Sequence, residues 1–137
     1  MTENRFENAR FVILGSSADA ELGREVSAVS PTRCLNLAGS SSLPEMVEWV
    51  RMSRCMVTND TGPMHVAAAL KKPIIALFGP TDPKRTGPYE ALKGVQRINL
   101  PCIPCMKSTC TWPEPMACLK GISPSSVFSV LEQQLAE

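Results

Sequence analysis

Short apolar runs that alternate with stretches of helical periodicity constrain the fold more than any other feature of the sequence. Single helical stretches between successive strands are typical of βαβ units and a parallel sheet. The runs are almost continuously apolar, as strands covered on both faces are, so the run at 11–14 predicts a buried strand. We therefore expect an α/β fold, a Rossmann-like parallel sheet with helices on both faces. The strands are expected at 11–14, 34–37, 55–58, 73–78 and, more weakly, 95–100.

Helices are expected between and after these strands. Apolar residues recur at helical spacing over 22–29, before Pro31. Ser42 and Glu45 form a capping-box pattern, in which each side chain satisfies a free backbone N–H at the start of a helix. Further helices are predicted at 63–71, where proline occupies the first turn, and from 124 onward.

Length and composition narrow the class of protein. A chain of 137 residues fits one domain. Lys and Arg number 14 and Asp and Glu 13, so the net charge of +1 gives no reason to expect a nucleic-acid partner. No apolar run is long enough to cross a bilayer, and the polar N-terminus does not resemble a secretory signal. Six cysteines without an export signal indicate a reducing compartment, so a cytoplasmic protein is expected.

The single histidine, His65, excludes several kinds of chemistry. A zinc hydrolase motif of the HExxH type needs two histidines, and no GxSxG elbow accompanies His65 for a serine triad. The sequence also lacks the GxxxxGK[ST] phosphate loop and the GxGxxG fingerprint.

The segment 58–65 is the strongest candidate for a binding site. It lies where a predicted strand ends and a helix begins, which is where ligands bind in open α/β sheets. Gly62 allows close approach to the backbone, and the helix N-terminus favours an anion such as a phosphate. Asp60 is unsuited to direct phosphate contact and fits a loop-orienting role or a sugar hydroxyl. On local physics alone, the favoured interpretation is that Asp60 and Thr61 cap the helix and that His65 is a hydrogen-bonded structural residue.

Three segments resemble the heptosyltransferase family of glycosyltransferases, which add heptose to the lipopolysaccharide inner core. The first, 59–70, has the pattern D-x-G-x-x-H-x-x-A-A, and the second, 72–83, ends in F-G-P-T-D-P. The third is Gly87-Pro-Tyr89. The combination is highly specific, and the similarity extends from about Phe11 to the C-terminus.

The resemblance implies the C-terminal half of a GT-B enzyme, which binds ADP-heptose or ADP. The family inverts the anomeric centre and requires no catalytic metal. Loop N–H groups would contact the diphosphate. Residues 39–42 would lie near the adenine and ribose, and residues 79–81 would form the neighbouring wall of the site. The donor-binding residues implied by the match are Asp60, Thr61, Gly62, Pro63, Met64, His65, Gly39, Ser41, Ser42, Gly79 and Thr81.

The sequence departs from the family pattern in two respects. The N-terminal acceptor domain, which supplies the catalytic base, has no counterpart, and neither does the first donor-domain strand with its lysine. In the order 3-2-1-4-5-6 that strand is central, so a gap is expected between the strands at 11–14 and 55–58. We therefore expect residues 1–137 to be one donor-binding domain of a larger enzyme, inactive alone and without a catalytic residue of its own. A second copy could complete the sheet as a homodimer.

In the full-length enzyme, the expected acceptor is the lipid A and inner-core part of lipopolysaccharide, at the inner face of the cytoplasmic membrane. Two alternatives remain open. One is an inactive nucleotide-binding or protein-interaction module, and the other is a GT-B transferase that uses a different nucleotide sugar.

A Cys- and Pro-rich loop over 101–121 also resembles a pattern in some family members. Thiolates suit a structural zinc site, and the first pair has the C-x2-C spacing of a zinc knuckle, while the second pair does not. A disulfide-bonded loop and unligated thiols are the alternatives. The candidate zinc ligands are Cys102, Cys105, Cys110 and Cys118.

Overall fold

A computed structural model describes residues 6–136. The chain forms two compact units, Met1–Trp49 and Val50–Glu137. Each unit contains its own parallel ladder of strands.

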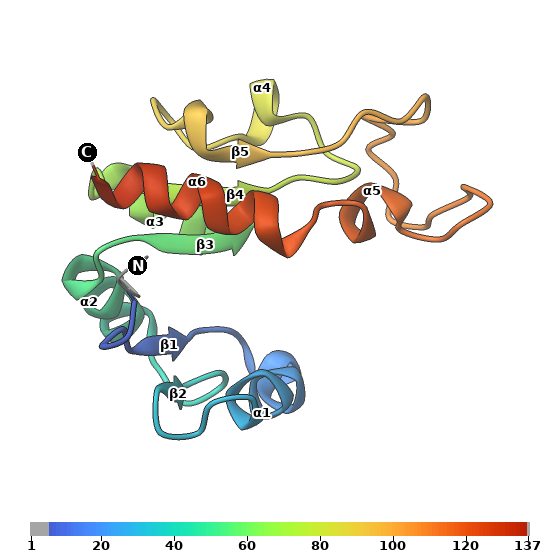
Figure 1. The fold of residues 1–137 in the computed structure, drawn as a ribbon. Helices are drawn as coiled ribbons and strands as arrows, with labels where there is room; N and C mark the ends of the chain where they lie inside the picture. Colours follow the sequence, from blue (N-terminus) through green and yellow to red (C-terminus); the bar gives the residue numbers. More distant parts are fainter. Residues whose placement is uncertain (1–5, 137) are drawn as a thin grey trace. The chain divides into compact units, whose positions relative to one another are not determined.

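The first unit contains β1 (Phe11–Ile13), η1 (Ser17–Asp19), α1 (Ala20–Ala28) and β2 (Cys34–Asn36) (Figure 1). The two strands pair in parallel, with Val12 opposite Leu35. Parallel neighbours need a crossover, and α1 provides it, so this unit is a single βαβ motif.

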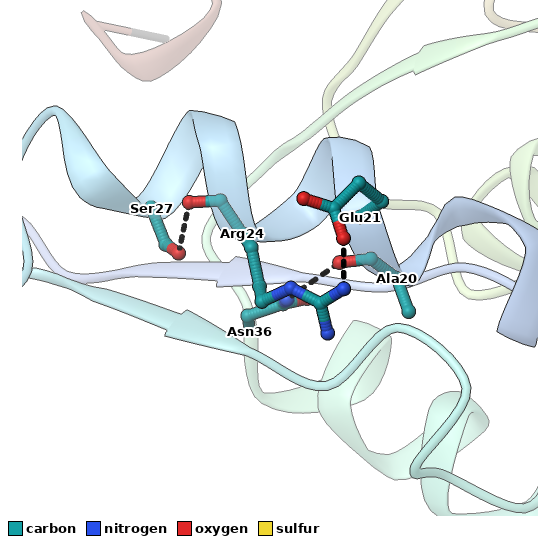
Figure 2. Close-up of polar contacts among 5 residues, drawn as sticks. All are labelled: Ala20, Glu21, Arg24, Ser27 and Asn36. Carbon is teal, nitrogen blue, oxygen red and sulfur yellow. Dashed lines mark hydrogen bonds and ion pairs between the residues drawn. The ribbon is translucent and has the colours of Figure 1, made fainter.

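Asn36 links the end of β2 to α1, as Figure 2 shows. Its side-chain amide donates to the carbonyl of Ala20 at 3.3 Å, and its Oδ1 accepts the N–H of Ala38 at 3.1 Å. Along α1 itself, Arg24 pairs with Glu21, and the Ser27 hydroxyl donates to the Arg24 carbonyl. Those contacts are exposed and contribute little to stability. The hydrogen bond from Asn36 to Ala20 is a polar link between α1 and β2.

The second unit is organised around a three-stranded parallel ladder in the order β3-β4-β5. Helix α2 begins in the first unit and ends in the second. The remaining elements, in chain order, are α2 (Leu43–Met52), β3 (Met56–Asn59), α3 (Gly62–Ala69), β4 (Ile74–Leu77), α4 (Pro83–Thr86), η2 (Leu92–Gly94), β5 (Val95–Gln96), α5 (Ala117–Lys120) and α6 (Pro124–Ala136).

The core of this unit lies on β4. This strand has a partner on each edge and contacts both α3 and α6. Ile75, Ala76 and Phe78 are fully buried, and Ile74 is nearly so. Consecutive buried residues mean that both faces of the strand are covered, which is the arrangement predicted from its apolar sequence.

Two strand predictions need correction. The strand at 11–14 is not buried, because Phe11 is 46% and Val12 36% exposed. Among the described residues, β1 pairs with β2 alone, so its apolar side chains lack the cover that β4 receives. The predicted strand at 95–100 is only Val95–Gln96, since just two residues of β4, Ala76 and Leu77, pair with it.

Within residues 6–136, β1 pairs with β2 in one ladder, and β3, β4 and β5 pair in the other. The parallel sheets flanked by helices confirm the prediction of an α/β, Rossmann-like fold.

Candidate functional site

The turn from β3 into α3 carries the motif singled out in the sequence. Thr58, at the end of β3, is buried, and its hydroxyl lies 3.4 Å from the hydroxyl of Thr61. Thr61 occupies the N-cap position of α3 with extended backbone, yet its side chain makes no capping hydrogen bond. Thr61 therefore stands at the predicted cap position, but its hydroxyl does not satisfy an N–H of the helix. The Met64 N–H donates to the Thr61 carbonyl at 3.2 Å and Pro63 has no N–H, so among the first three residues of α3 the Gly62 N–H is the donor left for another acceptor.

Space beside this helix start is open. A Cβ built on Gly62 meets no atom within 4 Å. Pro63 follows in the first turn, where its missing N–H has no cost, and Met64 is fully buried beneath the helix. His65 is exposed. An anion could thus approach the backbone at Gly62 without displacing protein atoms, and the helix dipole favours it there.

Asp60 does not cap α3 either. Its Oδ2 accepts a hydrogen bond from the hydroxyl of Thr86 at 2.8 Å, and both side chains are half-buried. Thr86 lies in α4, which follows the neighbouring strand β4. Sequence reasoning did not single out Thr86. The available signal was topological, because carboxyl ends of adjacent parallel strands meet at one edge of a sheet.

The turn from β4 into α4 contains two more predicted site residues. Gly79 is buried, and a Cβ there would lie 2.7 Å from Leu119 and 3.0 Å from the sulfur of Cys118. Close packing against α5 accounts for a glycine at this position. Thr81 is half-buried, one residue before Asp82, which caps α4 by accepting the N–H of Lys84 at 3.0 Å.

The remaining predicted residues belong to the first unit. Gly39 has a φ of +74°, a conformation that suits glycine, and its N–H donates to the Gly15 carbonyl at 2.9 Å. Ser41 is half-buried. Ser42 and Glu45 form the predicted capping box, with the Ser42 N–H and hydroxyl each 2.7 Å from Glu45 Oε2. These two bonds, the backbone one first, lower the pKa of Glu45.

All four cysteines of the 101–121 loop line one cavity of about 390 Å³, together with Trp112 and other side chains. They are unpaired thiols. Among residues 6–136, however, no three His, Cys, Asp or Glu side chains are grouped so that they could hold a metal ion. Backbone N–H groups of Met116 and Trp112 lower the pKa of the exposed Cys110 thiol. The structural-zinc hypothesis gains no geometric support and stays a prediction.

Comparison with known proteins identifies the family. Residues 4–115 match the model of glycosyltransferase family 9 (heptosyltransferase). The chain belongs to this family. The prediction from the motif at 59–70 and the F-G-P-T-D-P segment is confirmed.

Curated relatives are heptosyltransferases. Lipopolysaccharide heptosyltransferase 2 of Escherichia coli is 43% identical over 96 residues, which are 67% of this chain and 28% of the relative. Lipopolysaccharide heptosyltransferase 1 of Pseudomonas aeruginosa is 35% identical over 140 residues, with 88% of this chain and 37% of the relative covered. The chain therefore spans well under half the length of these relatives.

Solved structures agree. The structure of E. coli ADP-heptose LPS heptosyltransferase II matches with a TM-score of 0.73 and 33% identity, and covers 93% of this chain and 36% of its own. A family 9 glycosyltransferase from Veillonella parvula matches with a TM-score of 0.71 and 26% identity over the same share of this chain, and 37% of its own. Among the described residues, no helix is long and apolar enough to cross a membrane.

Proposed function

We propose that residues 1–137 form the nucleotide-sugar-binding part of an inverting glycosyltransferase that transfers heptose from ADP-heptose to the lipopolysaccharide inner core. The observation that carries this proposal is the start of α3, which no side chain caps and which has open space at Gly62, inside the segment matched by the family model. The names of the similar proteins from E. coli and P. aeruginosa supply the heptose and the lipopolysaccharide acceptor.

In this proposal the diphosphate lies against the N-terminus of α3. The backbone N–H of Gly62 is a donor of fixed direction, and the helix dipole adds a partial positive charge. When the sugar leaves, negative charge develops on the departing ADP. Donors already aimed at that charge stabilise it without reorganising, which is the role of an oxyanion hole.

Asp60 takes a different role. An ionised carboxylate only accepts hydrogen bonds, and it repels a phosphate. We assign it a hydroxyl of the sugar or ribose. No residue of this chain is assigned as the catalytic base, and an upstream acceptor domain is proposed to supply it.

The test is calorimetric titration with ADP-heptose, ADP and UDP, for the wild-type chain, Asp60→Ala and Glu25→Ala. Glu25 is an exposed carboxylate of α1 outside the motif, so its removal controls for the loss of one negative charge. We expect binding of the two adenine ligands, weakened in Asp60→Ala and retained in Glu25→Ala.

Other results have distinct meanings. Binding of UDP alone would keep a nucleotide-sugar transferase but replace ADP-heptose as its donor. If the wild-type chain binds none of the three, residues 1–137 do not hold the donor and the proposal fails.

A further inference from the structure

The orientation of the Asp60 carboxylate is controlled from outside its own loop. Asp60 follows β3, but the hydroxyl that donates to its Oδ2 at 2.8 Å comes from Thr86, 26 residues along the chain. This bond engages Oδ2 and leaves Oδ1 to accept from a ligand. Within a site for a diphosphate, the direction of an acceptor-only group decides whether it helps or opposes binding.

Thr86 is itself held firmly. Its backbone N–H donates to the Asp82 carbonyl at 3.0 Å, and the next residue, Gly87, donates to the Pro83 carbonyl at 2.9 Å. The Asp82 side chain caps the same turn through the N–H of Lys84. α4 therefore presents the Thr86 hydroxyl from a fixed backbone.

The hydroxyl has one proton and two acceptors within reach. Asp60 Oδ2 lies at 2.8 Å and the Asp82 carbonyl at 3.3 Å. The shorter contact, to a charged acceptor, is the stronger one. A threonine in a helical turn commonly bonds to the carbonyl four residues back, so donation to Asp60 departs from the local default.

We propose that Thr86 is a positioning residue that directs the Asp60 carboxylate toward a hydroxyl of the sugar in the nucleotide-sugar ligand. The inference rests on the proposed function and adds a specificity element to it. ADP lacks the sugar. Loss of the Thr86 hydroxyl therefore lowers the affinity for the nucleotide sugar more than the affinity for the bare nucleotide.

The experiment compares Thr86→Val, which keeps the shape and removes the donor, with Thr86→Ser, which keeps the donor. Calorimetry with ADP-heptose and with ADP is carried out for both variants and in the Asp60→Ala background. Thr86→Val is expected to weaken ADP-heptose binding about three- to tenfold, as loss of one hydrogen bond to a ligating group does, and ADP binding by less. Thr86→Ser is expected to bind ADP-heptose as tightly as the wild-type chain does. In the Asp60→Ala background, Thr86→Val has no further effect, because the two residues act as one unit.

A purely structural role for Thr86 predicts different results. Thr86→Val would then weaken the binding of ADP-heptose and of ADP equally, and this effect would persist in the Asp60→Ala background. Either result overturns the inference. Amide hydrogen exchange of the ligand-free chain supplies a second readout. Thr86→Val is expected to speed exchange over residues 60–64, and Thr86→Ser to leave it unchanged.

The proposed function and the positioning role of Thr86 can be overturned by different results. A wild-type chain that binds neither ligand overturns the proposed function, and exchange that is identical in wild type and Thr86→Val then overturns the positioning role as well. If the wild-type chain and Thr86→Val bind ADP-heptose with equal affinity, the positioning role alone is overturned.

Discussion

The two units of the molecule use similar sequence patterns and reach different degrees of burial. In Val50–Glu137, β4 lies between two strands, and Phe78 and Ile75 are completely buried. In the described part of Met1–Trp49, β1 and β2 have only each other, and apolar side chains such as Leu35 (46%) and Val29 (87%) stay exposed. An apolar run thus specifies a strand, while burial depends on how many neighbours that strand has.

The first way to break this comparison is to truncate one apolar side chain in each unit. Phe78→Ala leaves a cavity in a packed core and is expected to lower the free energy of unfolding by about 3–5 kcal/mol. Val29→Ala removes a side chain that is already in solvent and is expected to change it by no more than about 0.5 kcal/mol. Urea unfolding of both variants measures the difference. Similar losses in the two variants would mean that the units are equally packed.

The second comparison uses two glycines of the predicted site, one in each unit. Gly39→Ala places a side chain at a φ of +74° and 2.8 Å from the Cα of Ser17, so a loss of at least about 1–2 kcal/mol is expected. Gly62→Ala meets no protein atom, and alanine favours the helix by up to about 1 kcal/mol, so stability is expected to hold or rise.

Binding then separates the two glycines. The methyl group of Gly62→Ala occupies the space assigned to the diphosphate, so calorimetry is expected to show weaker ADP binding in a fully folded variant. Unchanged ADP affinity in Gly62→Ala would remove the argument from open space at α3.

The smallest expected effect is a pH dependence confined to the first unit. Hydrogen bonds from Ser16 lower the pKa of Asp19, and those from Ser42 lower the pKa of Glu45. A carboxyl whose folded pKa is depressed stabilises the fold above its unfolded value, here 3.8 and 4.5, and that contribution is lost as the pH falls through the folded pKa.

Amide exchange at the start of α2 is the measurement. We expect faster exchange over residues 43–46 as the pH falls below about 4.5, after correction for the intrinsic rate. In Glu45→Gln, which keeps a capping side chain but does not titrate, this acid-dependent change is expected to disappear. An equal change in the variant would assign the effect to another group.

Much of the fold could be predicted from the sequence, because the patterns that specify its helices and strands involve residues close together in the chain. The β4 run, the capping box at Ser42 and the proline at the start of α3 each depend on neighbouring residues, and each is present in the structure. The exposure of β1 could not be predicted in this way, since it depends on which strands pair.

The candidate site shows the same division. Thr61 and Gly62 were predicted as site residues from the strand–turn–helix pattern, and the family predicted from the surrounding motif is the one whose model matches the chain. Thr86 was not found, because its contact with Asp60 joins residues far apart in sequence. Gly79 was assigned to the site, although its packing against Leu119 and Cys118 already accounts for a glycine there.

The most direct test of the central claim is an amide NMR titration of the chain with ADP. The account predicts that the largest chemical-shift changes occur at the N–H groups of residues 61, 62, 64 and 65, where α3 begins, and that they are reduced in Gly62→Ala. Largest changes in the cysteine loop at 101–116, or none at the start of α3 while ADP binds, would contradict it.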